Sequence, residues 1–214
     1  MPKVRVAGFS LSLDGFGAGP HQSLDQPLGV GGPRLFQWMF PTRFFHEMTG
    51  QAGGDTGVDH DFAVRAMSGF GAFVLGRNMF GPQRGPWTDD QWKGWWGNNP
   101  PYHAPAFVLS HHPRPPIEME GGTTFHFITD GPESALAKAR KAAGAKDVKI
   151  AGGASTVRQY LALNAIDEMH LALSPAVLGR GEPLLLGIDL DRLGFTVVEH
   201  VSTAAAMHVV LSRG

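Results

Sequence analysis

Short apolar segments, each followed at once by glycine or polar residues, constrain the fold of this chain more than any other feature. They cover residues 4–11, 72–75, 106–109, 124–128 and 148–151. Their length and largely unbroken apolar character are typical of strands that are buried on both faces of a sheet. Segments with the apolar spacing of helices lie between them. This alternation predicts an α/β fold with a mixed, mostly parallel central sheet and helices on both faces.

The best-defined helix in the sequence covers residues 129–144. Asp130 offers a capping carboxylate, Pro132 suits the first turn, and Glu133 follows the cap by three residues. An alanine-rich run follows, and Gly144 suits the helix end. This segment therefore predicts a helix with both of its ends defined.

Apolar spacing predicts three further helices. Two of them cover residues 58–67 and 157–164, and a weaker pattern covers residues 35–45. Pro41 interrupts the weaker pattern, and we expect a break or kink there because proline lacks a backbone N–H.

The C-terminal part of the chain changes character. In residues 168–173 the large apolar side chains of Met169, Leu171 and Leu173 alternate with Glu168, His170 and Ala172. Residues 195–201 and 207–211 have the composition of two antiparallel strands. The sequence thus predicts a terminal antiparallel hairpin at the edge of the sheet. A chain of 214 residues with 43% hydrophobic residues can bury one substantial core, so we expect a single domain over residues 1–214.

Charge and cysteine content exclude several classes of function. The formal net charge of −1 gives no general attraction to nucleic acid or to a membrane surface, so we expect neither as a partner. The absence of cysteine excludes disulfides and thiolate chemistry and fits a reducing compartment. The N-terminal residues alternate charged and apolar side chains, unlike an export signal. We therefore expect a cytoplasmic protein.

Two long segments rich in glycine and proline are candidates for loops that serve a site. Residues 16–33 could form a lid, and residues 81–105 hold four of the five tryptophans. Aromatic clusters are usually core, but flat conjugated rings also bind well between aromatic faces. The candidates for a substrate wall are Phe16, Trp38, Phe40, Trp87 and Trp96.

The strongest candidate site is Gly152-Gly153-Ala154-Ser155-Thr156, between a buried strand and a helix. Two residues without side chains would let a phosphate approach the free N–H groups at the start of the helix. A tight turn that needs glycine only for its backbone angles explains the same pattern equally well.

Two further candidate motifs also follow buried strands directly. Gly76-Arg77-Asn78-Met79 combines close backbone approach with a planar donor fork that suits phosphate. Ser110-His111-His112-Pro113-Arg114 gathers hydroxyl, imidazole and guanidinium donors that suit a dianionic 2′-phosphate. A solvated loop would explain either motif taken alone.

Other reaction classes lack their motifs. No histidine pair has the i, i+4 spacing of a zinc-binding helix, so we expect no metal. There is no nucleophile elbow, no Gly-x-x-x-x-Gly-Lys phosphate loop, and no Gly-x-Gly-x-x-Gly after the first strand. Asp14, at the end of the first strand, is a candidate proton donor or substrate anchor, although an aspartate that caps a turn is the more common case.

In their order along the chain, these segments resemble the family that joins dihydrofolate reductase to the reductase domain of the bifunctional riboflavin-biosynthesis deaminase/reductase. The residues that carry the resemblance are Ser12-Leu13-Asp14-Gly15, Gly76-Arg77-Asn78-Met79, Gly152-Gly153-Ala154-Ser155, Asp167-Glu168-Met169-His170-Leu171 and Pro175-Ala176-Val177-Leu178-Gly179-Arg180-Gly181. The resemblance implies a three-layer dihydrofolate-reductase-like fold and NADPH as the hydride donor. It also implies a homodimer formed partly by the C-terminal strands.

The resemblance also implies roles for the candidate residues. It puts the Gly152-Gly153 turn on the pyrophosphate, Arg77 beside it, and Ser110 with its basic neighbours near the adenosine phosphate. Ala7 of the first strand joins these as a further cofactor-binding candidate. The substrate expected is a small, flat heterocyclic or carbonyl compound.

Two alternatives remain open at this point. One is the riboflavin-pathway 5-amino-6-(5-phosphoribosylamino)uracil reductase, and the other is a module on the same fold that binds NADPH or senses a ligand without catalysis. The long segments at residues 17–33 and 81–105, and Leu184-Leu185-Leu186 where a Leu-Phe pair is common, depart from the family pattern.

Overall fold

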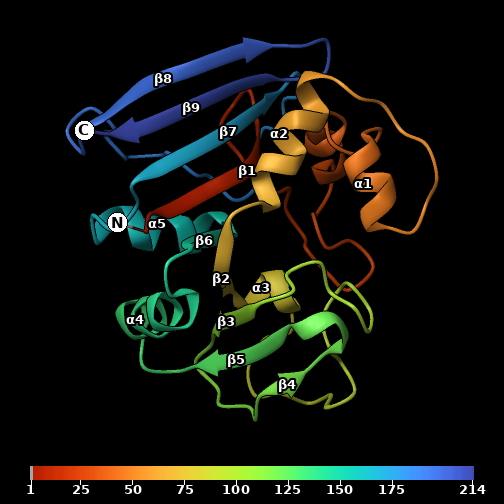
Figure 1. Ribbon diagram of the computed structural model, residues 1–214, viewed down its shortest axis with the longest axis vertical. Coiled ribbons are helices and arrows are strands. Elements are labelled where there is room, and N and C mark those ends of the chain that lie inside the picture. Colours follow the sequence, from red (N-terminus) through yellow and green to blue (C-terminus); the bar gives the residue numbers. More distant parts are fainter. Residues whose placement is uncertain (1) are drawn as a thin grey trace.

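The apolar segments form one continuous nine-stranded sheet in the computed structural model, which describes residues 2–214 (Figure 1). The strands lie in the order β4-β5-β3-β2-β6-β1-β7-β9-β8. Their bounds are β1 Val4–Ser12, β2 Phe70–Gly76, β3 Pro105–Leu109, β4 Ile117–Glu118, β5 Thr124–Ile128, β6 Asp147–Gly152, β7 Glu168–Ser174, β8 Phe195–Ser202 and β9 Met207–Arg213. The run from β5 to β7 is parallel, whereas β4, β9 and β8 are each antiparallel to a neighbour. The predicted mixed sheet and terminal hairpin are confirmed.

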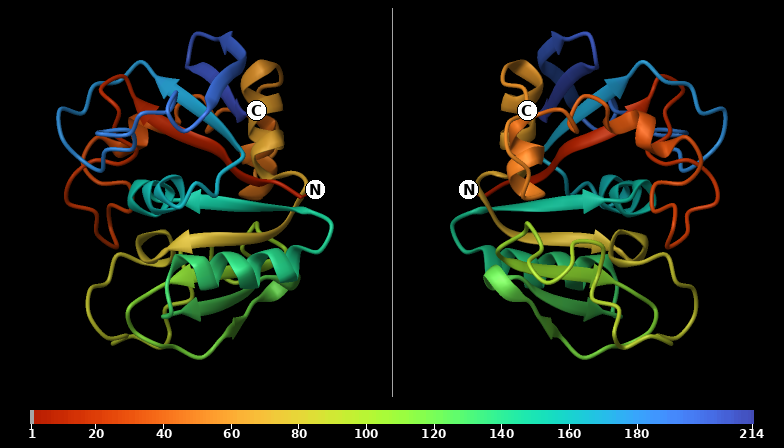
Figure 2. Two further views of the ribbon diagram at one scale, coloured as in Figure 1. Left: turned by 90° about the vertical axis from the view of Figure 1, so that its left-hand side faces the viewer. Right: turned by 90° about the vertical axis from the view of Figure 1, so that its right-hand side faces the viewer.

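Helices cover both faces of this sheet (Figures 1 and 2). They are η1 Gly32–Phe36, α1 Arg43–Met48, α2 Val58–Met67, α3 Arg77–Phe80, η2 Glu120–Gly122, α4 Pro132–Ala143 and α5 Ala154–Ala162. Helices α4 and α5 bury Leu136 and Tyr160 against Val74 on one face. Helix α2 packs on the opposite face, where Ala66 joins the cluster around Phe73. The helix predicted at residues 58–67 has the bounds of α2.

The weak helical pattern at residues 35–45 forms two short pieces instead of one helix. The 3-10 helix η1 ends at Phe36 and α1 begins at Arg43. Pro41 lies between them, where a missing N–H prevents a continuous helix. Thr42 then caps α1, because its side chain accepts the N–H of Phe45 at 3.2 Å.

Helix α4 has its predicted place but a different cap. Its N-cap is Gly131, and no side chain caps the helix. The Asp130 carboxylate accepts the Ser134 hydroxyl at 2.7 Å and the Lys138 ammonium at 3.1 Å instead. The predicted capping carboxylate is therefore wrong, because Asp130 binds side chains that lie further along the helix.

A β-bulge in β1 reverses which side chains face each layer. The pairing of β1 with β7 shifts register between Val6 and Phe9, and Gly8 has φ of 70°. Val6 and Phe9 consequently face the same core, although they are three residues apart. A bulge leaves a strand N–H without its ladder partner, and in β1 the His170 Nδ1 accepts the Gly8 N–H at 3.1 Å.

His170 begins a buried chain of hydrogen bonds that ends at a carboxylate. Because its Nδ1 accepts the Gly8 N–H, its Nε2 must donate, and it does so to His208 Nδ1 at 3.0 Å. His208 Nε2 then donates to Asp59 Oδ1 at 2.7 Å. The Phe62 ring stacks on both imidazoles at 4.5 and 4.2 Å. This array ties α2, β7 and β9 to the bulge of β1.

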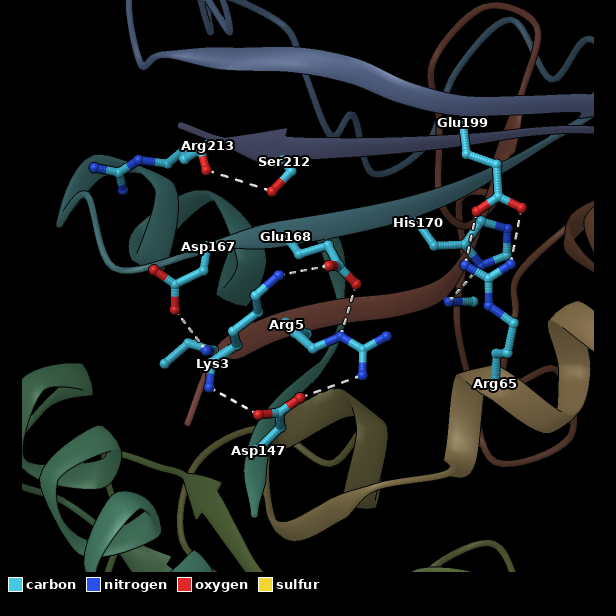
Figure 3. Close-up of polar contacts among 12 residues, drawn as sticks. Lys3, Arg5, Arg65, Asp147, Asp167, Glu168, His170, Glu199, Ser212 and Arg213 are labelled. Atoms are coloured by element: carbon cyan, nitrogen blue, oxygen red, sulfur yellow. Dashed lines mark hydrogen bonds and ion pairs between the residues drawn. The ribbon is translucent and has the colours of Figure 1, made fainter. Parts of the chain in front are cut away.

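Charged side chains join the amino ends of the central strands (Figure 3). Arg5 contacts Glu168 at 2.8 Å and Asp147 at 3.3 Å, and Lys3 contacts Glu168 at 3.1 Å. A separate bidentate pair joins Arg65 of α2 to Glu199 of β8. Ion pairs thus occupy the amino ends of these strands, and the motifs predicted from the sequence lie at the opposite, carboxyl ends.

Candidate functional site

Three of the motifs predicted from the sequence meet at the carboxyl edge of the parallel strands. Strands β3, β2 and β6 are neighbours, and each ends directly before or within one motif. Arg77 follows β2, Ser110 follows β3, and Gly153 follows β6. Ligands of open α/β sheets bind at this edge.

The Gly152–Gly153 turn presents a bare surface at the start of α5. Gly152 needs to be glycine because its φ is 123°, but Gly153 has φ of −69° and would tolerate a side chain. A Cβ on Gly153 would meet nothing within 4 Å, so no contact within the described chain accounts for the missing side chain. The peptide bond between the two glycines is cis.

The first N–H groups of α5 point out of the helix at this turn. Helix α5 has no side-chain cap, and among the described residues the N–H groups of Ala154 and Ser155 have no acceptor. Ser155 is exposed and Ala154 is buried. Free N–H groups and the positive end of the helix dipole together favour an anion.

Thr156 lies behind the turn and does not face this surface. It is 5% exposed, and its Oγ1 would lie 2.2 Å from a Cβ on Gly76. Its N–H already donates to Gly153 O at 3.0 Å. The prediction that Thr156 contacts a phosphate is therefore corrected, since its side chain packs α5 against β2. Met79 does reach the turn, with its sulfur 3.8 Å from a Cβ on Gly152.

Arg77 presents a pair of donors without partners. Its Nη1 donates to Ser110 Oγ at 3.4 Å, while its buried Nε and Nη2 have no acceptor among the described residues. These two N–H groups form the side-on fork that binds one oxyanion in bidentate fashion. Burial, with repulsion from Arg84 and Arg114, lowers the pKa of Arg77, but a guanidinium stays charged at neutral pH.

The residues after β3 divide between the site and its support. The Ser110 hydroxyl donates to His112 O at 2.9 Å and accepts from Arg77. His111 is exposed. Arg114 donates through Nη2 to Asp90 O and Trp92 O, both at 2.9 Å. Ser110 therefore lies beside the two unpartnered donors of Arg77. Arg114 mainly holds the tryptophan-rich loop of residues 81–105 through main-chain carbonyls.

Trp38 belongs to the core and not to a substrate wall. Its side chain is 1% exposed, its Nε1 donates to Ser10 Oγ at 2.8 Å, and its ring meets His208 edge-on at 5.0 Å. The substrate-wall prediction for Trp38 is corrected, because a side chain enclosed in this way offers no face to a ligand. Phe40 is half-buried and stacks on Phe36.

Two other aromatic candidates, Trp87 and Trp96, belong to the segment at residues 81–105 and differ in their surroundings. Trp96 is 39% exposed. Trp87 lies under Arg77, with the guanidinium carbon 3.7 Å from the centroid of the indole. Trp87 therefore faces the predicted phosphate site and not a separate substrate pocket.

Phe16 belongs to a loop that reaches the Gly152–Gly153 turn. It forms an isolated bridge with Pro183. A Cβ on the next residue, Gly17, would lie 2.6 Å from the Phe9 ring and 3.8 Å from the Ala154 Cβ. Phe9 also lies 3.2 Å from a Cβ on Gly152. No sequence pattern singles out Phe9, because an aromatic residue in a buried strand is ordinary core.

Ala7 lies in the bulge of β1, where its 6% exposed side chain packs in the cluster that includes Met79. Only its main chain is therefore placed to meet a ligand.

Asp14 caps a loop and does not suit the role of proton donor. Its carboxylate accepts the N–H of Leu178 at 3.1 Å and that of Gly179 at 2.6 Å. A hydrogen bond from the Ser12 side chain, followed by these two amides, lowers the pKa of Asp14. The catalytic prediction for Asp14 is corrected, because this setting favours the ionised carboxylate.

Main-chain hydrogen bonds join the loop after β1 to the loop after β7. Leu13 N donates to Ala176 O at 2.8 Å, and Gly17 N donates to Glu182 O at 2.9 Å. Further bonds run in the opposite direction, such as Leu184 N to Gly15 O at 3.0 Å. The two loops therefore form one double loop beside the Gly152–Gly153 turn.

The sequence matches the RibD C-terminal domain family over residues 2–209. The chain belongs to this family. A curated relative of this RibD C-terminal domain is the uncharacterized protein YyaP of Bacillus subtilis (strain 168), 37% identical over 62 residues. That aligned segment covers 29% of this chain and 32% of the relative.

Solved structures share the fold of this RibD C-terminal domain at low identity. A putative riboflavin biosynthesis protein from Shewanella sp. PV-4 is 22% identical with a TM-score of 0.54, over 99% of this chain and 97% of that one. Dihydrofolate reductase from Enterococcus faecalis, complexed with NADP(H) and RAB-propyl, is 14% identical with a TM-score of 0.54, over 99% and 96%. The deaminase/reductase of Thermotoga maritima is 14% identical with a TM-score of 0.54. This chain covers 57% of the Thermotoga chain and is itself covered completely.

These likenesses establish the dihydrofolate-reductase-like fold that the sequence predicts. In the described part of the chain, no helix has the length and apolar character needed to cross a membrane.

Proposed function

We propose that this protein is an NADPH-dependent reductase that acts on a small, flat heterocyclic or carbonyl substrate. The observation that carries the proposal is the buried, unpartnered fork of Arg77 beside Ser110. It lies at the same sheet edge as the bare Gly153 and the free N–H groups of α5. Membership of the RibD C-terminal domain family and the fold shared with an NADP(H)-bound dihydrofolate reductase support the same conclusion.

The residues present fit the two anionic parts of NADPH. The N–H groups of Ala154 and Ser155 would hold the diphosphate, which Gly153 lets approach because it has no side chain. The resemblance put Arg77 beside the pyrophosphate, but we propose that it holds the 2′-phosphate of the adenosine together with Ser110, because its Nη1 donates to the Ser110 hydroxyl. A ligand that offers no acceptor beside Arg77 would leave its buried donors unpaired, which is costly, and a phosphate is the acceptor that binds a guanidinium most strongly.

The reaction itself requires little acid or base chemistry from the chain. When bound, NADPH supplies a hydride. The protein's part is to orient donor and acceptor, which can contribute roughly 7–11 kcal/mol in favourable cases. The Phe9 ring, against Gly17 and Gly152, would help to exclude water there. Because Asp14 is held as a carboxylate, we propose that a water molecule supplies the proton.

Thermal-shift measurements with NADPH and NADH test the cofactor. We expect NADPH to raise the melting temperature more than NADH does, and we expect Arg77→Ala and Ser110→Ala to reduce this difference. Arg140→Ala, which removes an exposed arginine from α4, is the matched control and should leave it unchanged. If neither dinucleotide changes the melting temperature of the wild-type protein, the proposal is wrong.

The substrate is tested separately from the cofactor. Oxidation of NADPH is followed at fixed protein concentration with pterins, carbonyl compounds and 5-amino-6-(5-phosphoribosylamino)uracil. Turnover of the uracil derivative alone would identify the riboflavin-pathway reaction, for which the deaminase/reductase of Thermotoga maritima is named. Tight NADPH binding without turnover of any compound would favour a module that binds or senses the dinucleotide.

We also propose a homodimer formed through β8. This strand lies at the end of the sheet, and Val197 and Val198 are 55% and 59% exposed on it. An exposed apolar edge strand favours pairing with another chain. Val198→Lys should shift the mass in solution from dimer to monomer in analytical ultracentrifugation, and a wild-type monomer would refute the proposal.

A further inference from the structure

Buried polar side-chain atoms without partners gather in one part of the described chain. Within residues 2–214, five such atoms belong to Arg77, Asn78, Gln83 and Arg114. A buried group left without its hydrogen bond costs about 1–3 kcal/mol, so each one calls for an explanation. Three of the five are guanidinium nitrogens, and the other two are the amide oxygens of Asn78 and Gln83. The two nitrogens that Arg77 contributes are donors on one edge of a single cation, and such an edge suits an anion.

Trp87 holds the plane of the Arg77 guanidinium. The guanidinium carbon lies 3.7 Å from the indole centroid, which is well within the range of cation–π attraction. The Trp87 Nε1 donates to His112 O at 3.0 Å, and the same carbonyl accepts the Ser110 hydroxyl. Since Ser110 also accepts from Arg77 Nη1, these four residues form a closed ring of contacts.

This closed ring of contacts explains which edge of the Arg77 guanidinium is left free. Nη1 of Arg77 is engaged by Ser110, and one face of the guanidinium lies on the indole. The Nε and Nη2 edge is what remains. Rotation of the guanidinium within its plane would break the hydrogen bond to Ser110. Tilting it out of that plane would separate it from the Trp87 indole. Trp87 thus fixes both the plane of the fork and, through Ser110 and His112, its direction.

A purely structural role does not account for all contacts of Trp87. Its ring meets Phe80 and Phe127 edge-on, at 5.7 and 5.1 Å, and a large apolar residue could fill that space. Tryptophan combines a flat aromatic face, which here lies against Arg77, with a ring N–H, which here donates to His112 O.

The charges around Arg77 favour a doubly charged ligand. The neighbouring charged groups that act on Arg77 are the cations Arg84 and Arg114. Arg114 also approaches Trp87, at 5.2 Å from the ring centroid. Because no acidic group within residues 2–214 is among those that act on Arg77, the fork would gain more from a phosphate dianion than from a neutral hydroxyl.

We propose that Trp87 is a specificity-determining residue, which selects a dinucleotide with a phosphate on its adenosine over one with a hydroxyl there. It acts through Arg77 and is a positioning residue, not a catalytic one. The inference rests on the proposed function, because it assumes that a nicotinamide dinucleotide binds at this edge.

Calorimetric titration of wild type, Trp87→Leu and Trp92→Leu with NADPH and with NADH tests the proposal. Trp92 is the matched control, since it lies in the same loop and its Nε1 also donates to a carbonyl, Phe80 O at 2.8 Å. Loss of a desolvated cation–π contact should weaken NADPH binding about tenfold in Trp87→Leu. NADH binding should change less than about twofold, because NADH carries no phosphate for the fork. Trp92→Leu should keep the wild-type preference.

Two results would overturn the role of Trp87. Trp87→Leu could weaken both dinucleotides by the same factor, which would make its effect structural, or it could retain the full preference for NADPH. Trp87→Phe, which keeps an aromatic face under Arg77, serves if the leucine variant does not fold. It should retain most of the preference, and equal affinity for both dinucleotides in this variant would count against the proposal.

Failure of the proposed function gives a different result. If the wild-type protein binds neither dinucleotide, the proposed cofactor is wrong, and the same variants are titrated with inorganic phosphate, the group that we assign to the fork. Weaker phosphate binding in Trp87→Leu than in Trp92→Leu would then support the role of Trp87 at the fork. Equal binding in the two variants would refute it.

Discussion

Replacing His170 by asparagine should make the free energy of unfolding of this protein fall less steeply as the pH is lowered. His170 is 6% exposed, and its Nδ1 must carry no proton in order to accept the Gly8 N–H. Burial, followed by repulsion from His208, Arg65, Lys149 and Arg5, lowers the pKa of His170 to about 3. In an unfolded chain the pKa of histidine is about 6.5.

The sign and the size of the effect follow from these two pKa values. Between them the unfolded chain binds a proton at His170 and the folded protein does not, so acid favours unfolding. The contribution of His170 to stability is fully present above pH 6.5 and falls as the pH approaches 3. Between pH 7.5 and 5.0 the expected loss from this one residue is about 2 kcal/mol of unfolding free energy. That is a large part of the roughly 5–15 kcal/mol typical of a domain.

Urea unfolding of wild type and His170→Asn at pH 7.5 and 5.0 measures the effect. Asparagine can still accept the Gly8 N–H but does not titrate, so the variant, although less stable at pH 7.5, should lose about 2 kcal/mol less than wild type between the two pH values. His200→Asn, at an exposed histidine of β8, is the control and should follow wild type. An unchanged loss in His170→Asn would refute the reasoning, as would an NMR titration in which the native His170 ring takes up a proton above pH 5.

Three further predictions concern local packing and the ligand surface. Gly153→Ala should leave the melting temperature nearly unchanged but weaken NADPH binding at least about tenfold in calorimetry, because its Cβ meets only open space where we propose the diphosphate. Gly76→Ala would bring a Cβ within 2.2 Å of the Thr156 hydroxyl, and urea unfolding should report a loss of about 1–3 kcal/mol. Arg65→Ala should cost less than about 1 kcal/mol and less still in high salt, because its pair with Glu199 is about 40% exposed.

The sequence predicts the strands, and the common position of the motifs that follow them, for one physical reason. Strands of a parallel sheet are buried on both faces, so they stand out as apolar runs, and the residues that follow them share one edge. Arg77, Ser110 and Gly153 could be placed together on that basis. Strand β4, with two residues, is too short to leave any such pattern.

Features that depend on distant partners could not be predicted in the same way. The bulge in β1 leaves no mark in the sequence, because residues on both sides of the strand are apolar and no alternation changes phase. Trp38 and Trp87 are chemically the same residue, yet one lies in the core on Ser10 and the other lies under Arg77. Only the fold decides which partner each indole meets.

The hydrogen-bonded double loop beside Gly152 makes entry and exit at the site a joint event. The loop after β1 and the loop after β7, which are more than 150 residues apart in the sequence, are joined by main-chain hydrogen bonds such as that from Gly17 N to Glu182 O. Neither can swing aside alone without breaking several of these bonds. Any opening that admits a substrate or releases a product must therefore move both loops together. Substitutions in either loop should consequently alter the same rates of substrate entry and product release.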